Sequence, residues 1–484
     1  MKGLFILISK NKIFQYIFSR YLTYLIQFIN TIFIAINLGP FYLGIWGFIL
    51  LVLQYIGQFD LGIAHSVNAI ISINKQKNNS SQEIIGSALT LLMLLSFVVT
   101  FLFIFNQVFE INIGKKYNFD KYYIFVLIIG IIGYFNNLLS NVFRVHGHIL
   151  EIAINQSIFP ISCLIVIFNF KGDNLILAMI TANIFSFFLS FSLFIYRSPI
   201  KLKPLWDLNL FKTIQLKGFH LFIYNTSFYL IAISTKSFVS YYYSINEFGL
   251  YTFAFSLANA IILFLGSLSF LIFPKVINRL ANNNDNNSNR ILTKLRDSYI
   301  TISHLLILIS VFLFPVFILF TPQYENSTLA FGLVALTVGL YSNAFGYSSL
   351  LIAKNKEKRL SRLSFYAFLI NLILCYLITN ILNLSFSWIS IATMISYFFF
   401  ISLITKEGRE AIKLENTVNL VFNDAFPIRI IIPFITSFFI ISFSFHFIFN
   451  LIPIFLFILI NYKNLISSIT QMKEIIIRPS VIDI

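Results

Sequence analysis

The protein has 484 residues, of which 58% are hydrophobic and 11% are charged, and its formal net charge is +16. Soluble domains average about 25% charged residues, and the 59 phenylalanines of this chain would leave large apolar patches exposed on a water-soluble fold. The composition therefore excludes an ordinary soluble fold and indicates a chain that lies largely within a membrane.

Apolar segments of spanning length recur along the whole chain. A helix that crosses a bilayer needs roughly 20 predominantly apolar residues. Fourteen segments fit this requirement, and the last two form the shortest pair, joined by a turn near Asn450. The pattern predicts an all-α polytopic membrane protein with spans at residues 13–37, 43–68, 84–106, 122–141, 152–170, 175–196, 219–241, 250–272, 299–320, 328–352, 363–382, 385–404, 430–448 and 451–467.

The basic residues fall mainly on one side of these spans. With the N-terminus in the cytoplasm and the spans alternating, 28 of the 34 Lys and Arg residues lie on the cytoplasmic side, counting Lys463 near the cytoplasmic end of the last span, and 4 lie in outside loops. Cytoplasmic loops of membrane proteins carry such an excess of Lys and Arg. The asymmetry supports the span map, places both termini in the cytoplasm, and accounts for the net charge without a nucleic-acid partner.

The segments between the spans are too short for a catalytic domain. The longest outside loop runs only from residue 106 to residue 121, and the larger connections are all cytoplasmic. The sequence has no phosphate-binding loop, no dinucleotide-type glycine pattern and no Cys/His cluster with metal-ligand spacing. Cys163 and Cys375 lie in apolar runs, so we expect two free thiols. These features predict a protein without enzymatic activity, cofactor or metal.

A short pattern of glycines and aromatic residues occurs twice. Residues 38–48 read LGPFYLGIWGF and residues 244–253 read SINEFGLYTF, with Gly44 aligned on Gly249. Six spans separate these two outside turns, so the halves have the same orientation, as in the parallel repeats of many transporters. We predict two pseudo-symmetric six-helix lobes at 1–196 and 219–404, a cytoplasmic linker at 197–218, and a second linker with the last two helices at 405–484.

Five short motifs occur in an order that resembles a known family. They are LGPFYLGIWGF at 38–48, Phe59-Asp60-Leu61-Gly62-Ile63, Phe143-Arg144-Val145-His146-Gly147, Asn246-Glu247-Phe248-Gly249-Leu250-Tyr251 and Phe273-Pro274-Lys275. Together they cover about residues 10–355. The set resembles the polysaccharide exporters, above all the O-antigen and capsule repeat-unit flippases, of the multidrug/oligosaccharidyl-lipid/polysaccharide (MOP) exporter superfamily.

The resemblance implies a function and a location. Such flippases move an undecaprenyl-diphosphate-linked oligosaccharide, such as an O-antigen, capsule or exopolysaccharide repeat unit, to the outer leaflet of the cell inner membrane. By this resemblance we expect transport by alternating access, with the lipid-linked glycan and membrane lipids as partners. A glycan polymerase and glycosyltransferases are further candidate partners.

Arg20 is the first candidate for a substrate-binding residue. It lies inside the first span, roughly 10 Å from the start at 1.5 Å per residue, and ionisable residues within a membrane are costly and often functional. Its guanidinium stays charged and offers a planar fork of donors to phosphate oxygens, and the resemblance implies cationic residues in the transport cleft. Gln15, Ser19 and Thr23 share its helix face, so we expect this face to line the cleft. In the alternative, Arg20 reaches the cytoplasmic headgroups.

Five further polar residues are weaker candidates. Lys236 is a second cation within a span, although it can also reach the outside headgroups. Asp60 is either an ion-coupling group or a structural helix cap. Arg144 is either a first contact for the diphosphate at the cytoplasmic mouth or a positive-inside anchor. Asn225 and Asn259 either line the cleft or bridge helices by hydrogen bonds.

Other functions fit parts of the pattern. A multidrug-type cation antiporter or a lipid II flippase of the same superfamily would share the fold, but a cation antiporter needs acidic residues in its cleft, and Asp60 alone supplies few. A membrane polysaccharide polymerase would carry polar residues in a large outside loop, which this chain lacks.

Overall fold

The regular structure of this protein is helical throughout the residues that can be described. The computed structural model describes residues 12–73, 78–109, 114–282 and 285–477, and no strand occurs within these ranges. The predicted all-α fold is confirmed. The N-terminal segment 1–11 and the side chains of the Phe273-Pro274-Lys275 motif lie outside the described part.

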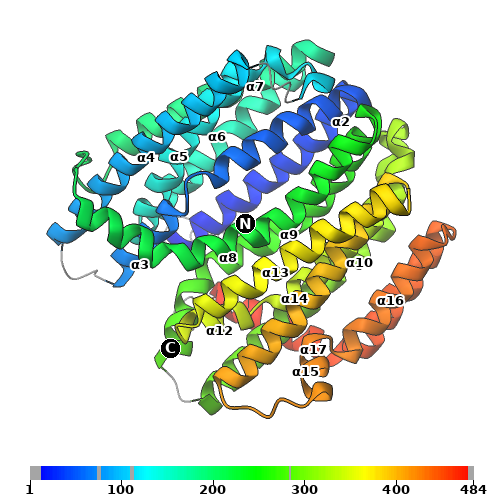
Figure 1. Ribbon diagram of the computed structural model, residues 1–484. Coiled ribbons are helices and arrows are strands. Elements are labelled where there is room, and N and C mark those ends of the chain that lie inside the picture. Colours follow the sequence, from blue (N-terminus) through cyan, green and yellow to red (C-terminus); the bar gives the residue numbers. More distant parts are fainter. Residues whose placement is uncertain (1–11, 74–77, 110–113, 283–284, 478–484) are drawn as a thin grey trace, which may run out of the picture. The chain divides into compact units, whose positions relative to one another are not determined.

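The chain divides into two compact units, Met1–Thr226 and Ser227–Ile484. The first unit (Figure 1) contains α2 (Lys12–Gln58), α3 (Ile63–Ile73), α4 (Asn78–Val108), the short 3-10 helices η1 (Lys115–Tyr117) and η2 (Phe119–Lys121), α5 (Tyr123–Val145), α6 (Ile149–Ile167), α7 (Gly172–Tyr196) and the start of α8 (Leu208–Tyr242). The second unit contains the rest of α8, α9 (Ile245–Asn282), α10 (Asp285–Phe320), η3 (Pro322–Ser327), α11 (Thr328–Tyr341), η4 (Ser342–Ala344), α12 (Tyr347–Ala353), α13 (Glu357–Tyr376), η5 (Leu377–Ile381), η6 (Phe386–Ile389), α14 (Ser390–Ala411), α15 (Val418–Ala425), α16 (Ile428–Ser442), η7 (Phe447–Asn450) and α17 (Leu451–Ile477).

Many of these helices are long and apolar enough to cross a membrane. Within the described residues ten segments meet this test, and the bent pair α15 and α16 would make an eleventh. The chain is therefore a multi-pass membrane protein. The first of the ten segments, Phe18–Gln58, contains parts of two predicted spans because α2 continues through the expected turn. The predicted number of fourteen spans stays a prediction.

Gly39 interrupts the long helix α2. Its backbone has φ 66° and ψ 172°, and Pro40 follows it. Glycine adopts a positive φ without the steric cost that a side chain brings, and proline is well placed at the first position of the next helical stretch. Figure 1 shows the two halves of α2 running side by side. The turn expected at 38–48 is thus reduced to a break at one residue.

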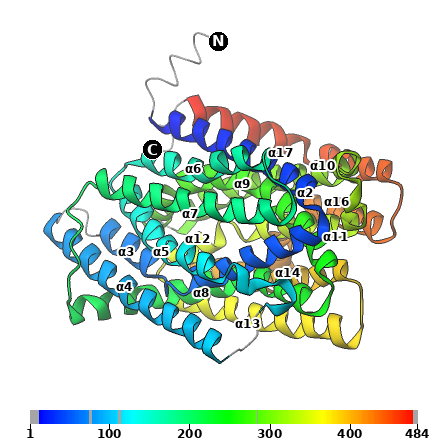
Figure 2. The same ribbon diagram turned by 90° about the horizontal axis from the view of Figure 1, so that it is seen from above.

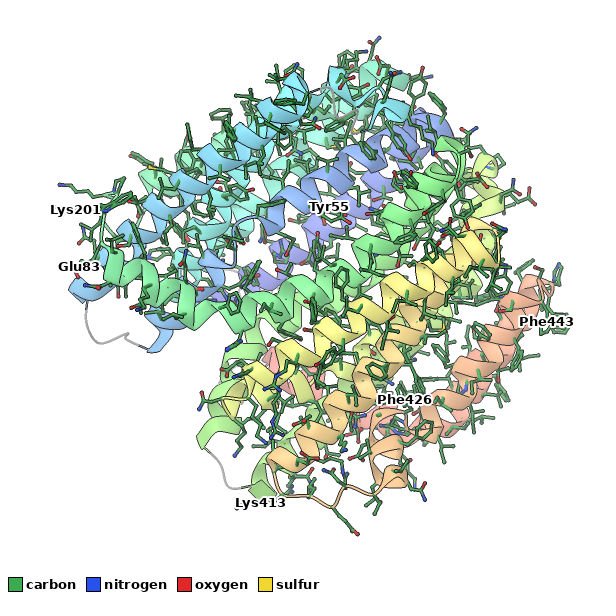
Figure 3. The ribbon with its side chains drawn as sticks, in the orientation of Figure 1. Tyr55, Glu83, Lys201, Lys413, Phe426 and Phe443 are labelled. Carbon is green, nitrogen blue, oxygen red and sulfur yellow. The ribbon has the colours of Figure 1, made fainter. Side chains whose placement is uncertain are left out.

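The connections of the first unit gather at two ends, as the predicted alternation requires. At one end Gln82 donates to the carbonyl of Lys201 (3.2 Å), so the linker after α7 lies beside the start of α4; Figure 3 shows Glu83 and Lys201 there. At the other end Lys121 forms an ion pair with Asp173. The first group of segments was predicted to be cytoplasmic and the second to be outside.

The second unit has its own core. Four buried side chains, Ile300, Leu308, Ile430 and Phe457, bring α10, α16 and α17 together, and α17 packs along α10 (Figure 2). At one end of this unit Arg359 forms ion pairs with Glu407 and Glu410, which ties the start of α13 to the end of α14. These segments were also predicted to be cytoplasmic.

Candidate functional site

Arg20 lies in the first half of α2 with a tyrosine one turn away on each side. Its guanidinium donates a hydrogen bond to the hydroxyl of Tyr24 and lies over that ring, 4.5 Å from the centroid. Tyr16 is also hydrogen-bonded to Arg20. Residues four apart share a helix face, so the three side chains form a cluster built by one helix. Arg20 remains partly exposed, and its Nε has no hydrogen-bond partner among the described residues.

Arg144 extends this cluster from a second helix. It belongs to the last turn of α5, and its charge acts on both Tyr16 and His65. Its side chain is partly buried. Arg20 and Arg144, which lie far apart in the sequence, therefore belong to one group of polar residues in the first unit. We call Tyr16, Arg20, Tyr24 and Arg144 the arginine cluster.

Asp60 makes the contacts of a structural cap between α2 and α3. Its Oδ1 accepts the backbone N–H of Gly62 (2.9 Å), and its Oδ2 accepts a hydrogen bond from Asn137 (3.1 Å). Gly62 has φ 71°, and a Cβ there would lie 2.8 Å from the Cβ of Phe222. The carboxylate is 6% exposed and also acts on His65. Both oxygens thus support the chain where the helix is broken.

The neighbours of Arg20 on α2 differ from each other in exposure. Phe18, Leu22 and Leu25 are each 48% exposed. Thr23, however, is 2% exposed, and its hydroxyl lies 2.7 Å from that of Ser157 in α6. Thr23 therefore packs within the first unit and does not continue the polar face expected to line a cleft.

Lys236 is the second cation predicted to lie within a span, and it is deeply buried in the second unit. It is 2% exposed, and its Nζ lies 4.8 Å from the ring centroid of Phe255 in α9. No carboxylate in the described part of the chain forms an ion pair with it. A cation over an aromatic face is stabilised by the ring quadrupole, so Phe255 partly compensates the charge.

A buried network of neutral polar groups begins on the residues before Lys236. Thr235 Oγ1 lies 2.6 Å from Thr393 Oγ1, and Ser234 donates to Asn371 Oδ1 (2.9 Å). Asn371 in turn donates to Thr393 Oγ1 (3.2 Å). The network joins α8, α13 and α14 within the second unit.

The two predicted asparagines have different surroundings. Asn259 donates to the carbonyl of Phe255 (2.8 Å), one turn earlier on α9, so this bond lies within its own helix. Asn225, on α8, is partly exposed. Within the described residues neither side chain forms a hydrogen bond to a second helix, and a role for either in binding substrate stays a prediction.

Some members of these groups escaped the sequence analysis. Tyr16 and Tyr24 could have been found, because each is four residues from Arg20 in a predicted helix. Asn371 and Thr393 could not, since each is an isolated polar residue in an apolar span. Only the packing of α13 and α14 on α8 brings them to Thr235.

One protein family matches the part of the chain that contains the arginine cluster and Lys236. The family is described as "Polysaccharide biosynthesis protein", and it matches residues 9–277, more than half of the chain. The protein belongs to this family. No curated protein matches it.

Several solved structures of transporters have a fold similar to that of this chain. The lipid II flippase MurJ, in an inward closed conformation, is 15% identical, with a TM-score of 0.68 over 96% of this chain and 99% of that one. An inward-facing multidrug resistance MATE family transporter of the MOP superfamily is 12% identical, with a TM-score of 0.65 over 81% and 94%. The Vibrio cholerae MATE transporter VcmN is 17% identical, with a TM-score of 0.59 over 84% and 98%. At these identities the likeness concerns the fold, so the chain has a fold like those of the MurJ and MATE structures.

Proposed function

We propose that this polysaccharide biosynthesis family member is a flippase that translocates an undecaprenyl-diphosphate-linked oligosaccharide across the cell inner membrane by alternating access. The observation that carries the proposal is the arginine cluster within the apolar helices of the first unit. A diphosphate needs cations along its path through hydrocarbon, whereas the lipid tail can remain in the bilayer.

The chemistry of the cluster suits a diphosphate. The guanidinium of Arg20 is a fork of donors that matches phosphate oxygens. Arg20 is partly exposed, so an incoming anion can reach its side chain, and its buried Nε has no hydrogen-bond partner among the described residues. Tyr16 and Tyr24 hold the side chain on one face of α2. Arg144, in the last turn of α5, is the proposed first contact on the cytoplasmic side.

Lys236 is a secondary member of this proposal. At 2% exposure it meets a substrate only if α8 and α9 separate around it. Asn225 and Asn259 are proposed as polar contacts for the glycan. The protein performs no bond-making step in this scheme, both termini are cytoplasmic, and any polymerase or glycosyltransferase acts before or after translocation.

Reconstitution tests the proposal. The purified protein is placed in liposomes that contain an undecaprenyl-diphosphate-linked oligosaccharide with a labelled sugar, and access of an external sugar-modifying reagent to the inner-leaflet pool is followed over time. We expect translocation in wild-type liposomes and little in protein-free liposomes. Parallel liposomes contain lipid II or a small cationic dye.

Each result of this assay separates the competing functions. Faster movement of lipid II than of the oligosaccharide lipid would assign the protein to peptidoglycan precursors, and movement of the dye alone would make it a cation antiporter. Hydrolysis or extension of the glycan by the purified protein would show an enzyme and overturn the proposal.

A further inference from the structure

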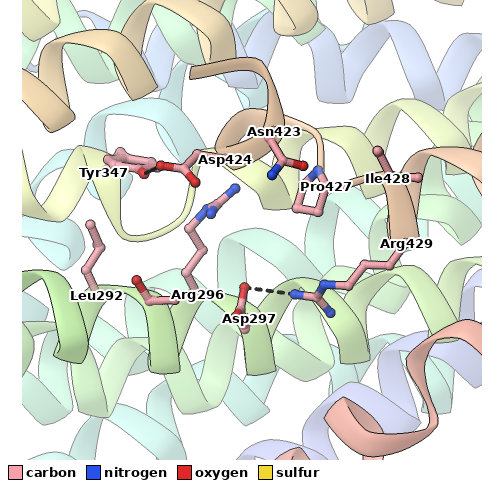
Figure 4. A pocket seen from close by; sticks show the side chains of 10 residues that line it. Leu292, Arg296, Asp297, Tyr347, Asn423, Asp424, Pro427, Ile428 and Arg429 are labelled. Carbon is pink, nitrogen blue, oxygen red and sulfur yellow. Dashed lines mark hydrogen bonds and ion pairs between the residues drawn. The ribbon is translucent and has the colours of Figure 1, made fainter. Parts of the chain in front are cut away.

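A pocket of about 350 Å³ lies within the second unit, away from the network around Thr235. It is formed by α10, α12 and the bent pair α15 and α16 (Figure 4). These elements include the connections at 273–298 and 405–429, both predicted to be cytoplasmic. The residues that line the pocket are Leu292, Thr293, Arg296, Asp297, Tyr347, Asn423, Asp424, Pro427, Ile428 and Arg429.

Arg296 is the unusual member of this lining. The residue is only 4% exposed, yet its Nε and Nη2 are buried and have no hydrogen-bond partner. Its guanidinium lies over the ring of Tyr347, 5.2 Å from the centroid, and Figure 4 shows it pointing from α10 towards Asn423 and Asp424. Removing a charge from water is costly unless the charge is paired and hydrogen-bonded. The Nε and Nη2 donors of Arg296 therefore lack the acceptors that would compensate for burying its charge.

The carboxylates of the pocket do not fill this need. Asp424 forms an ion pair with Arg409 and accepts a hydrogen bond from Tyr347 (3.1 Å). Asp297 forms an ion pair with Arg429 (2.8 Å). Each carboxylate thus has a cationic partner, and no ion pair within the described residues includes Arg296. One positive charge is left over on the pocket wall.

We propose that this pocket binds a phosphate-bearing anion, with the unpartnered guanidinium of Arg296 as its principal ligand. The planar fork of an arginine suits two phosphate oxygens, and Thr293 and Asn423 supply further hydrogen-bonding groups on the lining. Because Asp297 and Asp424 also line the pocket, a singly charged phosphate is favoured over a highly charged polyanion. Such an anion is either the phosphodiester of an anionic phospholipid or free phosphate from the cytoplasm. The site is independent of the proposed transport substrate.

Ligand-dependent thermal stability of the purified full-length protein tests this site. Sodium phosphate and the anionic lipid phosphatidylglycerol are added separately to protein in a neutral detergent, and sodium chloride at equal ionic strength is the control for screening. A ligand that binds only the folded state raises Tm as its concentration exceeds Kd. We expect at least one of the two probes to raise the Tm of the wild type by a few degrees above the chloride control.

Two substitutions at Arg296 and one outside the pocket test whether the rise in Tm comes from this site. Arg296→Met removes the fork and is expected to abolish the shift, whereas Arg296→Lys keeps the charge and is expected to weaken affinity about tenfold because bidentate bonding is lost. Arg290→Met removes the same charge from an exposed position on α10 outside the pocket lining, and it should leave the shift unchanged.

The outcomes also separate the two sources of phosphate. A shift with phosphatidylglycerol alone identifies a lipid headgroup, and a shift with inorganic phosphate shows that the bare anion suffices. Absence of any shift in the wild type overturns the proposal, as does an equal shift in wild type and Arg296→Met. If Arg296→Met does not yield folded protein, wild-type affinity in Arg296→Lys overturns it instead.

Discussion

Arg20 and Lys236 are both cations within predicted spans, yet the two units of the molecule accommodate them differently. Arg20 is partly exposed and is held by tyrosines of its own helix. Lys236 is 2% exposed and faces a phenylalanine of the next helix. Exposure, more than charge, therefore distinguishes a cation that a ligand can reach from one that the fold covers.

The largest effect is expected for Arg20→Ala. Hydrogen bonds to charged groups contribute about 1.5–3 kcal/mol, so loss of this contact should weaken substrate binding roughly 10- to 100-fold. Polysaccharide export in a flippase-deficient strain measures the effect, with the amount of folded protein in the membrane as the control. Arg20→Lys should restore export only in part. Normal export by Arg20→Ala at wild-type abundance would leave Arg20 as an interface anchor.

The second effect concerns the helix break at Gly62, which the carboxylate of Asp60 supports. Gly62→Ala places a Cβ 2.8 Å from that of Phe222 at a residue with φ 71°. Strain at such a position costs on the order of 1–3 kcal/mol, so we expect a lower Tm in detergent. Gly57→Ala is the matched control, because Gly57 lies within α2 with nothing within 4 Å. Equal Tm values for the two variants would contradict this view of Gly62.

A smaller effect is expected in the neutral network beside Lys236. Thr235→Val removes a hydroxyl that contacts Thr393 and Asn371, and leaving a buried polar group without its partner costs about 1–3 kcal/mol. We expect a loss of stability near the lower end, since Asn371 and Thr393 still bond each other. Thr436→Val, at a partly exposed position on α16 where the hydroxyl bonds its own helix, is the comparison. Similar Tm values for both would show that the network is not stabilising.

The smallest effect is expected for Lys236→Met, which tests the comparison directly. Replacing a buried charge by an apolar side chain of similar volume is often neutral or stabilising by about 1–4 kcal/mol, and Phe255 would retain a packing partner. Tm should be unchanged or higher, and export should fall less than in Arg20→Ala. If Lys236→Met lost export as completely as Arg20→Ala does, the burial of the two cations would not predict their importance for transport.

The two copies of the glycine and aromatic motif show how far sequence reasoning reaches. The first copy breaks its helix at Gly39, as the glycine and the following proline suggested. In the second copy Ser244 and Glu247 form reciprocal bonds at the start of α9, with Glu247 N–H to Ser244 Oγ at 3.2 Å and Ser244 N–H to the Glu247 carboxylate at 2.9 Å. This is the capping box of a Ser followed three residues later by Glu, a signal that the alignment on Gly249 overlooked.

The sequence by itself determined the helical membrane fold and the family, and it predicted that Arg20 and Lys236 lie within spans. The fold follows from composition and the length of the apolar runs, and the family from the resemblance of its short motifs. The two tyrosines beside Arg20 follow from their spacing on one helix face. Tertiary structure alone decided that Thr23 packs on Ser157, that Lys236 is covered, and that Arg296 faces a pocket without a partner. The physical reason is that burial and pairing depend on side chains from helices distant in sequence. The sequence of one apolar span does not determine which other helix packs against it.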